Sequence, residues 1–452
     1  MIATALFQRS VEPAELLIRG GHVLDPRAGI DGPHDLLIRA GRLAEIAPPN
    51  SISIPEGADL LDATGKHVFP AFVDPHVHLR TPGQEYKETI ATGTASAAAG
   101  GFGMVAAMPN TAPPVDDASI LRAQTQTAQH DARVPTGFLA AITRGRKGEE
   151  LTEMAELREA GALGFTDDGW PVVSGGMLRK ALQYQRLCGG VLVLHEEDPA
   201  LSAGGAMHEG AVSARLGLAG IPCVSESTMV SRDAALALYE GGRVHFQHLS
   251  CAHSVAALER AKSEGARVSA EVSPHHLTLT DESVRTLDSR FKMNPPLRTE
   301  ADRKSLVQAL RSGLIDCVAT DHAPHATHEK EVPFEQAAMG TTGLETAFAS
   351  LYTTLVLGGE LKLTTLVERM TGGAAIFGLP VPTVALDELA SVCVVDLEAS
   401  FQVGARGYVS RSENCCFHGQ MFRGRVLMTV AGGTLAFRAP AVTDSTALAA
   451  VK

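Results

Sequence analysis

The sequence predicts an α/β fold: a closed (β/α)8 barrel of the TIM type with a small β-sandwich domain built from both chain ends. Three observations predict this fold. The middle of the chain alternates near-continuous apolar segments with stretches rich in Ala, Leu, Glu and Arg, which is typical of parallel strands separated by helices. Eight such units follow one another, the number that closes a barrel of this kind. The two ends of the chain consist instead of short strands and glycine turns.

The eight apolar segments are the expected barrel strands. They are residues 72–78, 103–109, 135–142, 162–167, 190–195, 243–249, 266–272 and 314–320. Helical stretches such as 151–160 and 252–264 separate them. The alternative is a doubly wound open sheet, which is expected to carry a glycine-rich phosphate loop after its first strand. The first segment ends instead in His76-Val77-His78, so the sequence favours the barrel.

The chain ends predict the second domain. Residues 16–25 are expected to form two strands joined by a Gly20-Gly21 turn, and residues 35–46 are expected to repeat this arrangement. Further strands and turns are expected at 392–396, 420–426 and 430–435. The predicted division is 1–67 (N-terminal part of the β domain), 68–377 (barrel), 378–440 (C-terminal part of the β domain) and 441–452 (a loose tail).

Composition excludes several classes of protein. The chain has 452 residues, of which 45% are hydrophobic and 20% charged, enough for one barrel and a smaller domain. The formal net charge is −12 and no run of five basic residues occurs, which argues against a nucleic-acid partner. The seven scattered cysteines lack Cys-x-x-Cys spacing and indicate free thiols. No apolar run predicts a membrane span or a signal peptide, so we expect a cytoplasmic protein.

The first strand carries a candidate metal site. Side chains alternate along a strand, so His76 and His78 project to the same side and can hold one metal ion. Arg80 continues that face and places a fixed cation beside the metal, which suits chemistry on an anionic substrate. Taken alone, the pattern also fits an exposed strand end with two unrelated histidines.

Other potential ligands follow other strands at the same end. Asp168 follows the fourth strand, His195 ends the fifth, His248 lies on the sixth and Asp321 follows the eighth. The carboxyl ends of barrel strands converge on one face, where active sites of barrels lie. Four histidines and two aspartates are a suitable ligand set for two divalent cations. Two such cations can share a water and activate it. A carboxylate must bridge them, for which we select Asp168, and Asp321 is the expected general base.

Several longer motifs carry a family resemblance. They are Asp74–Thr89 (DPHVHLRTPGQEYKET), Ala107–Thr111, Gly164–Gly169, Met207–Gly210, Ala270–Leu277, Lys292–Arg298 and Ala319–His325. In combination they resemble the dihydroorotases of the amidohydrolase superfamily, and the two-part β domain also fits this family. The resemblance implies interconversion of N-carbamoyl-L-aspartate and L-dihydroorotate, the third step of pyrimidine synthesis. It also implies two divalent metal ions, with zinc as the expected metal.

The resemblance assigns roles residue by residue. Its metal ligands match His76, His78, Asp168, His195, His248 and Asp321, with Asp321 also catalytic. Its substrate contacts match His78, Arg80, Asn110, Asn294, His325, Met339 and Gly340. Many relatives have a carbamylated lysine at the bridging position, whereas this chain has Asp168, as in one bacterial class. The family often has Phe-Gly where this chain has Met339-Gly340, a change that a backbone contact to the substrate would survive.

The segment after Asp168 is a candidate lid. Gly169 and Gly175 bound it, and it contains Pro171 and Trp170, the single tryptophan of the chain. The alternative is a static loop whose tryptophan packs on the barrel rim. His208, His275 and His276 fit no part of this chemistry, and a structural role is the simplest interpretation for each.

Three functions remain in competition. The first is hydrolysis of dihydroorotate, and the second is another cyclic amidase activity of the hydantoinase or allantoinase type. Arg80 favours a substrate with a carboxylate, which a hydantoin lacks. The third is a silent scaffold subunit for aspartate carbamoyltransferase, which would be expected to lose metal ligands. A small-molecule substrate is expected, and a homodimer and a carbamoyltransferase complex are left open as protein partners.

Overall fold

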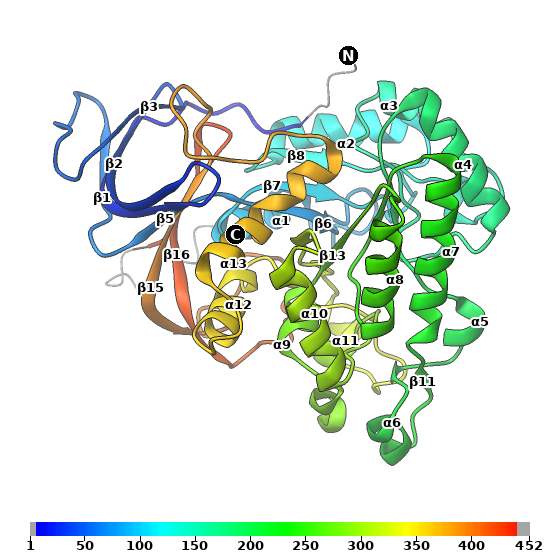
Figure 1. The fold of residues 1–452 in the computed structure, drawn as a ribbon. Coiled ribbons are helices and arrows are strands. Elements are labelled where there is room, and N and C mark those ends of the chain that lie inside the picture. The colour runs from blue at the N-terminus through cyan, green and yellow to red at the C-terminus, as the bar shows by residue number, and fades with distance from the viewer. Residues whose placement is uncertain (1–5, 441–452) are drawn as a thin grey trace.

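Parallel strands of the central region, which lie among the helices in Figure 1, form sheets of four and three strands that single bridges join into a closed barrel. The computed structural model describes residues 6–440. The barrel strands are β6 (Phe72–Val77), β7 (Phe102–Ala107), β8 (Thr136–Phe138), β9 (Leu192–Leu194), β12 (Val244–Phe246), β13 (Val268–Val272) and β14 (Cys317–Val318). A parallel bridge between Val77 and His322 joins the last segment to the first, and the His78 amide donates to the His322 carbonyl at 2.9 Å. The predicted barrel is therefore confirmed.

The fourth predicted strand, 162–167, is reduced to single bridges. Phe165 pairs in parallel with Ala140 on one side and Leu192 on the other, which keeps the ring closed. Asp167 explains the shortening, because its Oδ1 accepts the backbone amides of Ile142 and Thr143 at 2.9 and 3.0 Å. A side chain thus takes over the pairing that a longer strand would have made.

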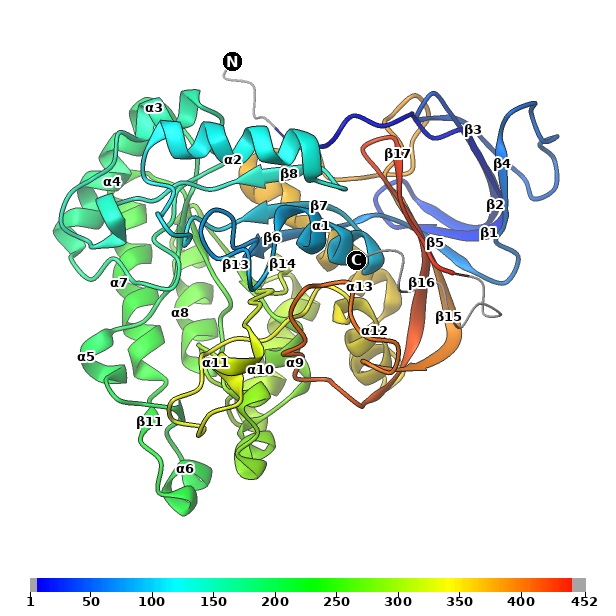
Figure 2. The ribbon, with the colours of Figure 1, turned by 180° about the vertical axis from the view of Figure 1, so that it is seen from behind.

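Helices cover the outside of the barrel, as Figures 1 and 2 show from opposite sides. The longer ones are α1 (Ile90–Ala99), α2 (Ala118–Asp131), α4 (Gly175–Cys188), α7 (Val224–Glu240), α8 (Ala252–Ser263), α10 (Glu300–Ser312) and α13 (Leu363–Thr371). Shorter ones are α3 (Met154–Glu159), α5 (Pro199–Ser202), α6 (Ala211–Leu216), α9 (Pro274–Thr278), α11 (Thr327–Lys330) and α12 (Ala347–Leu351). The small strands β10 (Met207–His208) and β11 (Gly220–Ile221) pair with each other beside α6.

Both chain ends build one eight-stranded sheet beside the barrel. Its members are β1 (Leu16–Asp25), β2 (Ile30–Arg39), β3 (Arg42–Ala47), β4 (Asp59–Asp62), β5 (His67–Pro70), β15 (Val392–Gln402), β16 (Met421–Ala431) and β17 (Thr434–Arg438). The two halves meet where β5 pairs antiparallel with β15, with Val68 opposite Val394. Ile18, Ile38, Val68 and Val394 belong to one buried core, so the domain from both ends is stabilised by its own apolar contacts.

Two details of the sheet differ from the sequence prediction. Gly20-Gly21 is a bulge within the single strand β1 and not a turn, because Asp35 Oδ1 accepts the Gly20 amide at 2.8 Å and holds the irregularity in place. The turn near the C-terminus lies at Gly432-Gly433, so residues 421–431 form one strand where a break was expected. The predicted tail 441–452 lies outside the described residues.

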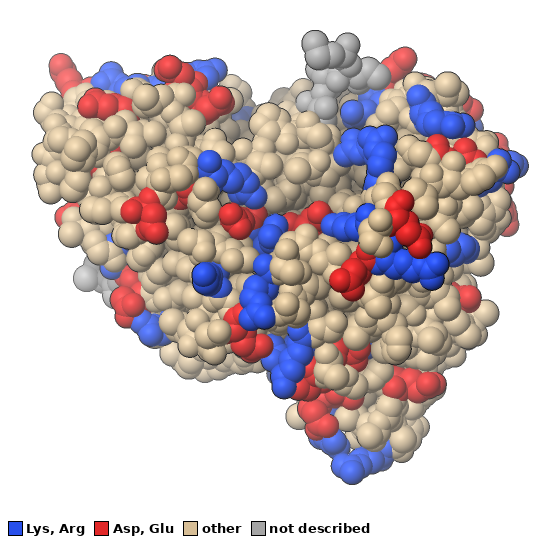
Figure 3. Space-filling view, viewed as in Figure 1, with Lys and Arg blue, Asp and Glu red and all other residues tan. Residues whose placement is uncertain are grey.

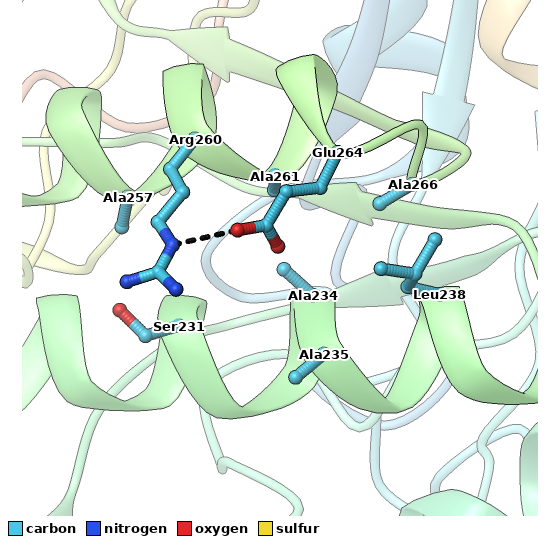
Figure 4. A pocket seen from close by; sticks show the side chains of 9 residues that line it. All are labelled: Ser231, Ala234, Ala235, Leu238, Ala257, Arg260, Ala261, Glu264 and Ala266. Atoms are coloured by element: carbon cyan, nitrogen blue, oxygen red, sulfur yellow. Dashed lines mark hydrogen bonds and ion pairs between the residues drawn. The ribbon is translucent and has the colours of Figure 1, made fainter.

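The outer surface carries charges of both signs and a groove between two helices. Acidic and basic side chains are interspersed over the face in Figure 3. α7 and α8 leave a groove of about 220 Å³, lined largely by small side chains, and an Arg260–Glu264 ion pair at 2.8 Å runs along its α8 side (Figure 4). Among residues 6–440, none of the helices combines the length and the apolar composition needed to cross a membrane.

Candidate metal centre and active site

The predicted ligands converge at the carboxyl ends of the barrel strands. His78 Nε2 lies 3.0 Å from Asp321 Oδ1, and His76 Nε2 lies 3.5 Å from the same oxygen. Asp168 Oδ1 lies 3.3 Å from His76 Nε2. All of these side chains are buried. Two imidazoles and two carboxylates therefore direct their donor atoms at one small volume.

A second pair of histidines faces the same volume. His195 Nδ1 lies 3.0 Å from His248 Nε2. The donor atoms of His248, His76 and Asp168 all lie within 4.8 Å of one another, as do those of His76, His78 and Asp321. Asp168 thus lies between the two histidine pairs, which is the place of a shared ligand.

The remaining nitrogens of three of these histidines already have partners. His76 Nδ1 is 2.6 Å from Glu271 Oε1, His78 Nδ1 is 2.8 Å from Asn110 Oδ1, and His195 Nε2 is 3.1 Å from Glu197 Oε2. Because an acceptor holds the proton on one ring nitrogen, the other nitrogen presents a lone pair to the centre. This orientation and the mixture of imidazole and carboxylate donors suit borderline divalent cations.

Charge and burial act together on the protonation of this centre. Burial alone would lower the pKa of His76, but Glu271, Asp168 and Asp321 outweigh it and raise that pKa well above its usual value. Burial would raise the pKa of Asp168, but His76 and its neighbours hold it well below the usual range. Burial lowers the pKa of His248 well below its usual value. Since a ligand histidine must be neutral, metal uptake at His76 is expected to release a proton.

Three residues of the donor cluster and its surroundings have strained backbone conformations. Arg80, His248 and Asp321 adopt φ angles of 57°, 30° and 48°, in the left-handed region that L-residues rarely occupy. Such strain persists only where the surrounding structure imposes it, and it is common at functional sites. It also ends the strands, which explains why β12 and β14 stop short of the predicted 249 and 320.

Glu271 also belongs to the site, although no motif spacing predicted a role for it. It lies on β13, and its Oε2 is 3.0 Å from His245 Nε2 while Oε1 contacts His76. Burial would raise the pKa of Glu271, but His76 and His245 lower it to about 2. The carboxylate therefore stays charged and fixes the orientation of His76. Glu271 lies in the Ala270–Leu277 motif at the end of a predicted barrel strand, and this position could have indicated a role in the site.

Replacing Glu271 with glutamine should weaken metal binding by about 10–100-fold, the usual cost of losing an outer partner of a ligand histidine. The neutral amide keeps the shape but has only one acceptor oxygen, so it cannot accept hydrogen bonds from both histidines as the two carboxylate oxygens do. Metal competition with a chelator measures the effect. Glu264→Gln, an exposed change at the C-terminal end of α8, is the control, and equal affinity in the two variants would contradict the role of Glu271.

The predicted substrate contacts lie around the donor cluster. Asn110 contacts two predicted ligands, since its Nδ2 also donates to Asp168 Oδ2 at 3.2 Å. Asn294 Nδ2 donates to Glu197 Oε2 at 2.7 Å, and Glu197 was not predicted. Arg80 is buried, with Nε donating to the Pro324 carbonyl at 3.2 Å. Burial lowers the pKa of Arg80, and the nearby Asp321 and Asp168 oppose that shift.

His325 and the Met339-Gly340 segment form one side of the site. His325 Nε2 donates to the Met339 carbonyl at 2.8 Å, and burial lowers the pKa of His325 to about 4, so its ring is neutral. Gly340 has φ +134°, and a Cβ there would lie 2.7 Å from the Ala323 Cβ, so only glycine fits. The Gly340 amide donates to the Lys292 carbonyl at 2.9 Å.

The segment predicted as a lid lies beside Asp168. Trp170 is 60% exposed, and Gly169 has φ +79°. The carbonyls of Val172 and Val173 accept bonds from Arg232 at 2.8 and 2.6 Å, so this part is tied to α7. The exposed tip is therefore centred on Trp170, while Gly175 is already the first residue of α4.

The closed barrel, the sheet from both chain ends and the buried histidine–aspartate cluster together define a barrel hydrolase of the amidohydrolase type. A solved structure, the L-hydantoinase (dihydropyrimidinase) from Arthrobacter aurescens, shares this architecture with a TM-score of 0.83. It is 26% identical and covers 93% of this chain and 96% of its own. The dihydropyrimidinase from Brevibacillus agri has the same fold, with a TM-score of 0.81 at 22% identity, covering 94% of this chain and 95% of its own.

Sequence relatives narrow this class. The Dihydro-orotase-like family matches residues 65–254. The dihydroorotase of Pelotomaculum thermopropionicum is 45% identical over 93% of this chain and 97% of its own length. That of Anaeromyxobacter dehalogenans is 46% identical over the same shares. The chain belongs to the dihydroorotase family.

Proposed function

We propose that the protein catalyses the reversible hydrolysis of the cyclic amide of L-dihydroorotate to N-carbamoyl-L-aspartate, in the synthesis of UMP. The observation that carries the proposal is the buried cluster of six oriented donors with the Arg80 guanidinium beside it. An anionic ring with an amide bond suits such a site, because a guanidinium can bind the carboxylate while the amide lies at the donors.

The donor set fits two divalent cations, for which zinc is the expected metal. Bound cations would supply Lewis acidity and a hydroxide at neutral pH. His76 and His78 would hold one cation, His195 and His248 the other, with Asp168 shared between them. We assign to Asp321 the transfer of the proton from the attacking water to the leaving nitrogen; the assignment is supported by the 3.0 Å between its Oδ1 and His78 Nε2.

The remaining contacts position the substrate. Arg80 would pair with the carboxylate, and Asn294 and His325 flank the ring. The Gly340 amide already has a partner, so a backbone contact from this segment falls to Met339. His78 and Asn110 belong both to the metal centre and to the predicted substrate contacts. Asn110 orients His78 and also donates a hydrogen bond to Asp168.

A comparison of substrates tests the proposal. Purified protein loaded with zinc should hydrolyse L-dihydroorotate and should form it from N-carbamoyl-L-aspartate at lower pH. Hydantoin and allantoin, which lack the carboxylate, should be used far more slowly. Faster hydrolysis of hydantoin than of dihydroorotate would overturn the assignment, and no turnover of any of these substrates would point to a silent scaffold.

Arg80→Lys keeps a positive charge but loses the planar pair of donors. We expect a loss of about 1–3 kcal/mol in kcat/KM for dihydroorotate, the scale of a charge-assisted hydrogen bond. Steady-state kinetics measure the loss, and bound metal should stay unchanged. Wild-type kinetics in this variant would show that the carboxylate binds elsewhere.

We further propose that the tip Gly169–Pro171 closes over the substrate. Dihydroorotate should then shift the emission of Trp170, the single tryptophan, and the shift should saturate with binding.

Gly169→Ala should lower kcat because φ +79° disfavours alanine. Gly175→Ala is the control, since a Cβ there makes only an ordinary contact, 3.7 Å from Leu236 Cδ1. If dihydroorotate does not change the Trp170 emission and Gly169→Ala has wild-type kinetics, the segment is a static loop and not a lid.

The proposal also covers the cellular location, the assemblies and the domain division of the enzyme. We place it in the cytoplasm, and propose a homodimer and a complex with aspartate carbamoyltransferase as its assemblies. The domain division that we propose is 1–67 and 378–440 for the β domain and 68–377 for the barrel. Sedimentation of the purified chain, alone and with the carbamoyltransferase, tests both assemblies.

A further inference from the structure

A second group of metal-binding side chains lies outside the site described above. Cys223 immediately precedes α7, Cys251 immediately precedes α8, and His253 is the second residue of α8. The proposed reaction uses none of them. All seven cysteines of the chain are free thiols, and no other two of them share a metal-binding group within residues 6–440.

The three donor atoms are close enough to share one ion. The sulfurs of Cys223 and Cys251 and a ring nitrogen of His253 all lie within 4.8 Å of one another. In a tetrahedral zinc site two sulfurs, each about 2.3 Å from the metal, are about 3.8 Å apart. Small side-chain adjustments would therefore complete the geometry. Cys251 is buried, Cys223 half-buried and His253 exposed, so an ion can reach the thiols from solvent past the imidazole.

The surroundings of Cys223 favour its thiolate. The Cys251 thiol, as hydrogen-bond donor, lowers the pKa of Cys223 to about 4, and His208 and Arg298 act in the same direction. The same hydrogen bond raises the pKa of Cys251, so one sulfur is a thiolate before an ion binds and the other must release its proton on binding. His208 and Asp302 also lie within 4.8 Å of Cys223. Arg298, however, donates to His208 Nδ1 at 3.2 Å, and this fixed cation disfavours a metal on that side. A cation bound by Cys223 is therefore expected on the side that faces Cys251 and His253.

We propose that Cys223, Cys251 and His253 form a third metal site that takes a thiophilic divalent cation, of which zinc is the physiological example. Two thiolates and one imidazole are a donor set for such an ion, and water completes the tetrahedron. The bound ion joins the beginnings of α7 and α8. It also ties down the segment that follows His248, three residues before Cys251. The proposal is independent of the reaction assigned to the barrel.

Cobalt binding to the full-length, reduced chain tests the site. The donor set of the barrel metal centre contains no cysteine, so an ultraviolet thiolate-to-cobalt charge-transfer band reports the third site alone. Wild-type protein should develop this band up to one equivalent per chain, and zinc should abolish it. Cys223→Ser should remove the band, and His253→Gln, an exposed change, should weaken cobalt binding by at least about tenfold. Cys188→Ser, at the far end of α4, should leave it unchanged.

Three results would overturn the proposal. The first is the absence of a thiolate band in reduced wild-type protein, and the second is a band of equal intensity in Cys223→Ser. The third is a Cys223–Cys251 disulfide found by mass spectrometry in protein purified under cytosol-like reducing conditions, since a disulfide cannot supply thiolate ligands. His253→Gln keeps both thiols and the buried surroundings, so the affinity comparison holds even if a serine variant is unstable.

Discussion

Asp168→Ala is expected to abolish hydrolysis and to leave fewer than two divalent ions per chain. Asp168 lies 3.3 Å from His76 and within 4.8 Å of His248 donor atoms, so its carboxylate reaches both histidine pairs. Its removal takes away the charge that would temper the repulsion between two adjacent cations. Asn110 would also lose the acceptor that fixes its amide, and with it part of the orientation of His78.

Metal analysis after dialysis and a dihydroorotate assay measure this result. Asp168→Asn is the shape-matched variant and should also lose metal, because the charge and not the size of the side chain is required. Asp131→Ala, an exposed aspartate at the end of α2, should behave as wild type. Two tightly bound ions in Asp168→Ala would show that Asp168 is not a bridging ligand.

Asp321→Asn is expected to lower kcat by about 10²-fold or more while at least one metal ion stays bound. The amide keeps the shape of the side chain and an oxygen near His78, but it cannot take up a proton, and general-base catalysis contributes about 10²–10⁴-fold. Because Asp321 also lies 3.5 Å from His76, some loss of metal affinity is expected, and kcat must be measured at saturating metal.

The matched control is Asp316→Asn, which lies just before β14, whereas Asp321 follows it. Asp316 pairs with Lys262 at 2.8 Å, at the opposite end of the strand from the donors. The control should keep kcat near the wild-type value. A kcat near wild type in Asp321→Asn, with metal bound, would show that another group moves the proton.

The barrel and most of the donor cluster follow from local pattern. The two-residue period of a strand places His76 and His78 on one side, whatever the rest of the fold. Apolar segments followed by Asp168, His195, His248 and Asp321 predict convergence, because parallel strands bring their carboxyl ends together. Motifs that span much of the chain then indicated the family, and the relatives at 45% identity agree.

Tertiary structure alone decided what each of these side chains touches. Glu271 reaches His76 across 195 residues of sequence, and no periodicity relates the two. The Gly20-Gly21 bulge depends on Asp35, a side chain of the neighbouring strand. Cys223 and Cys251 meet because α7 and α8 pack side by side and begin at the same end of the barrel. Sequence determines which element a residue occupies, whereas hydrogen bonds and ligand geometry arise between elements, through packing that local pattern does not encode.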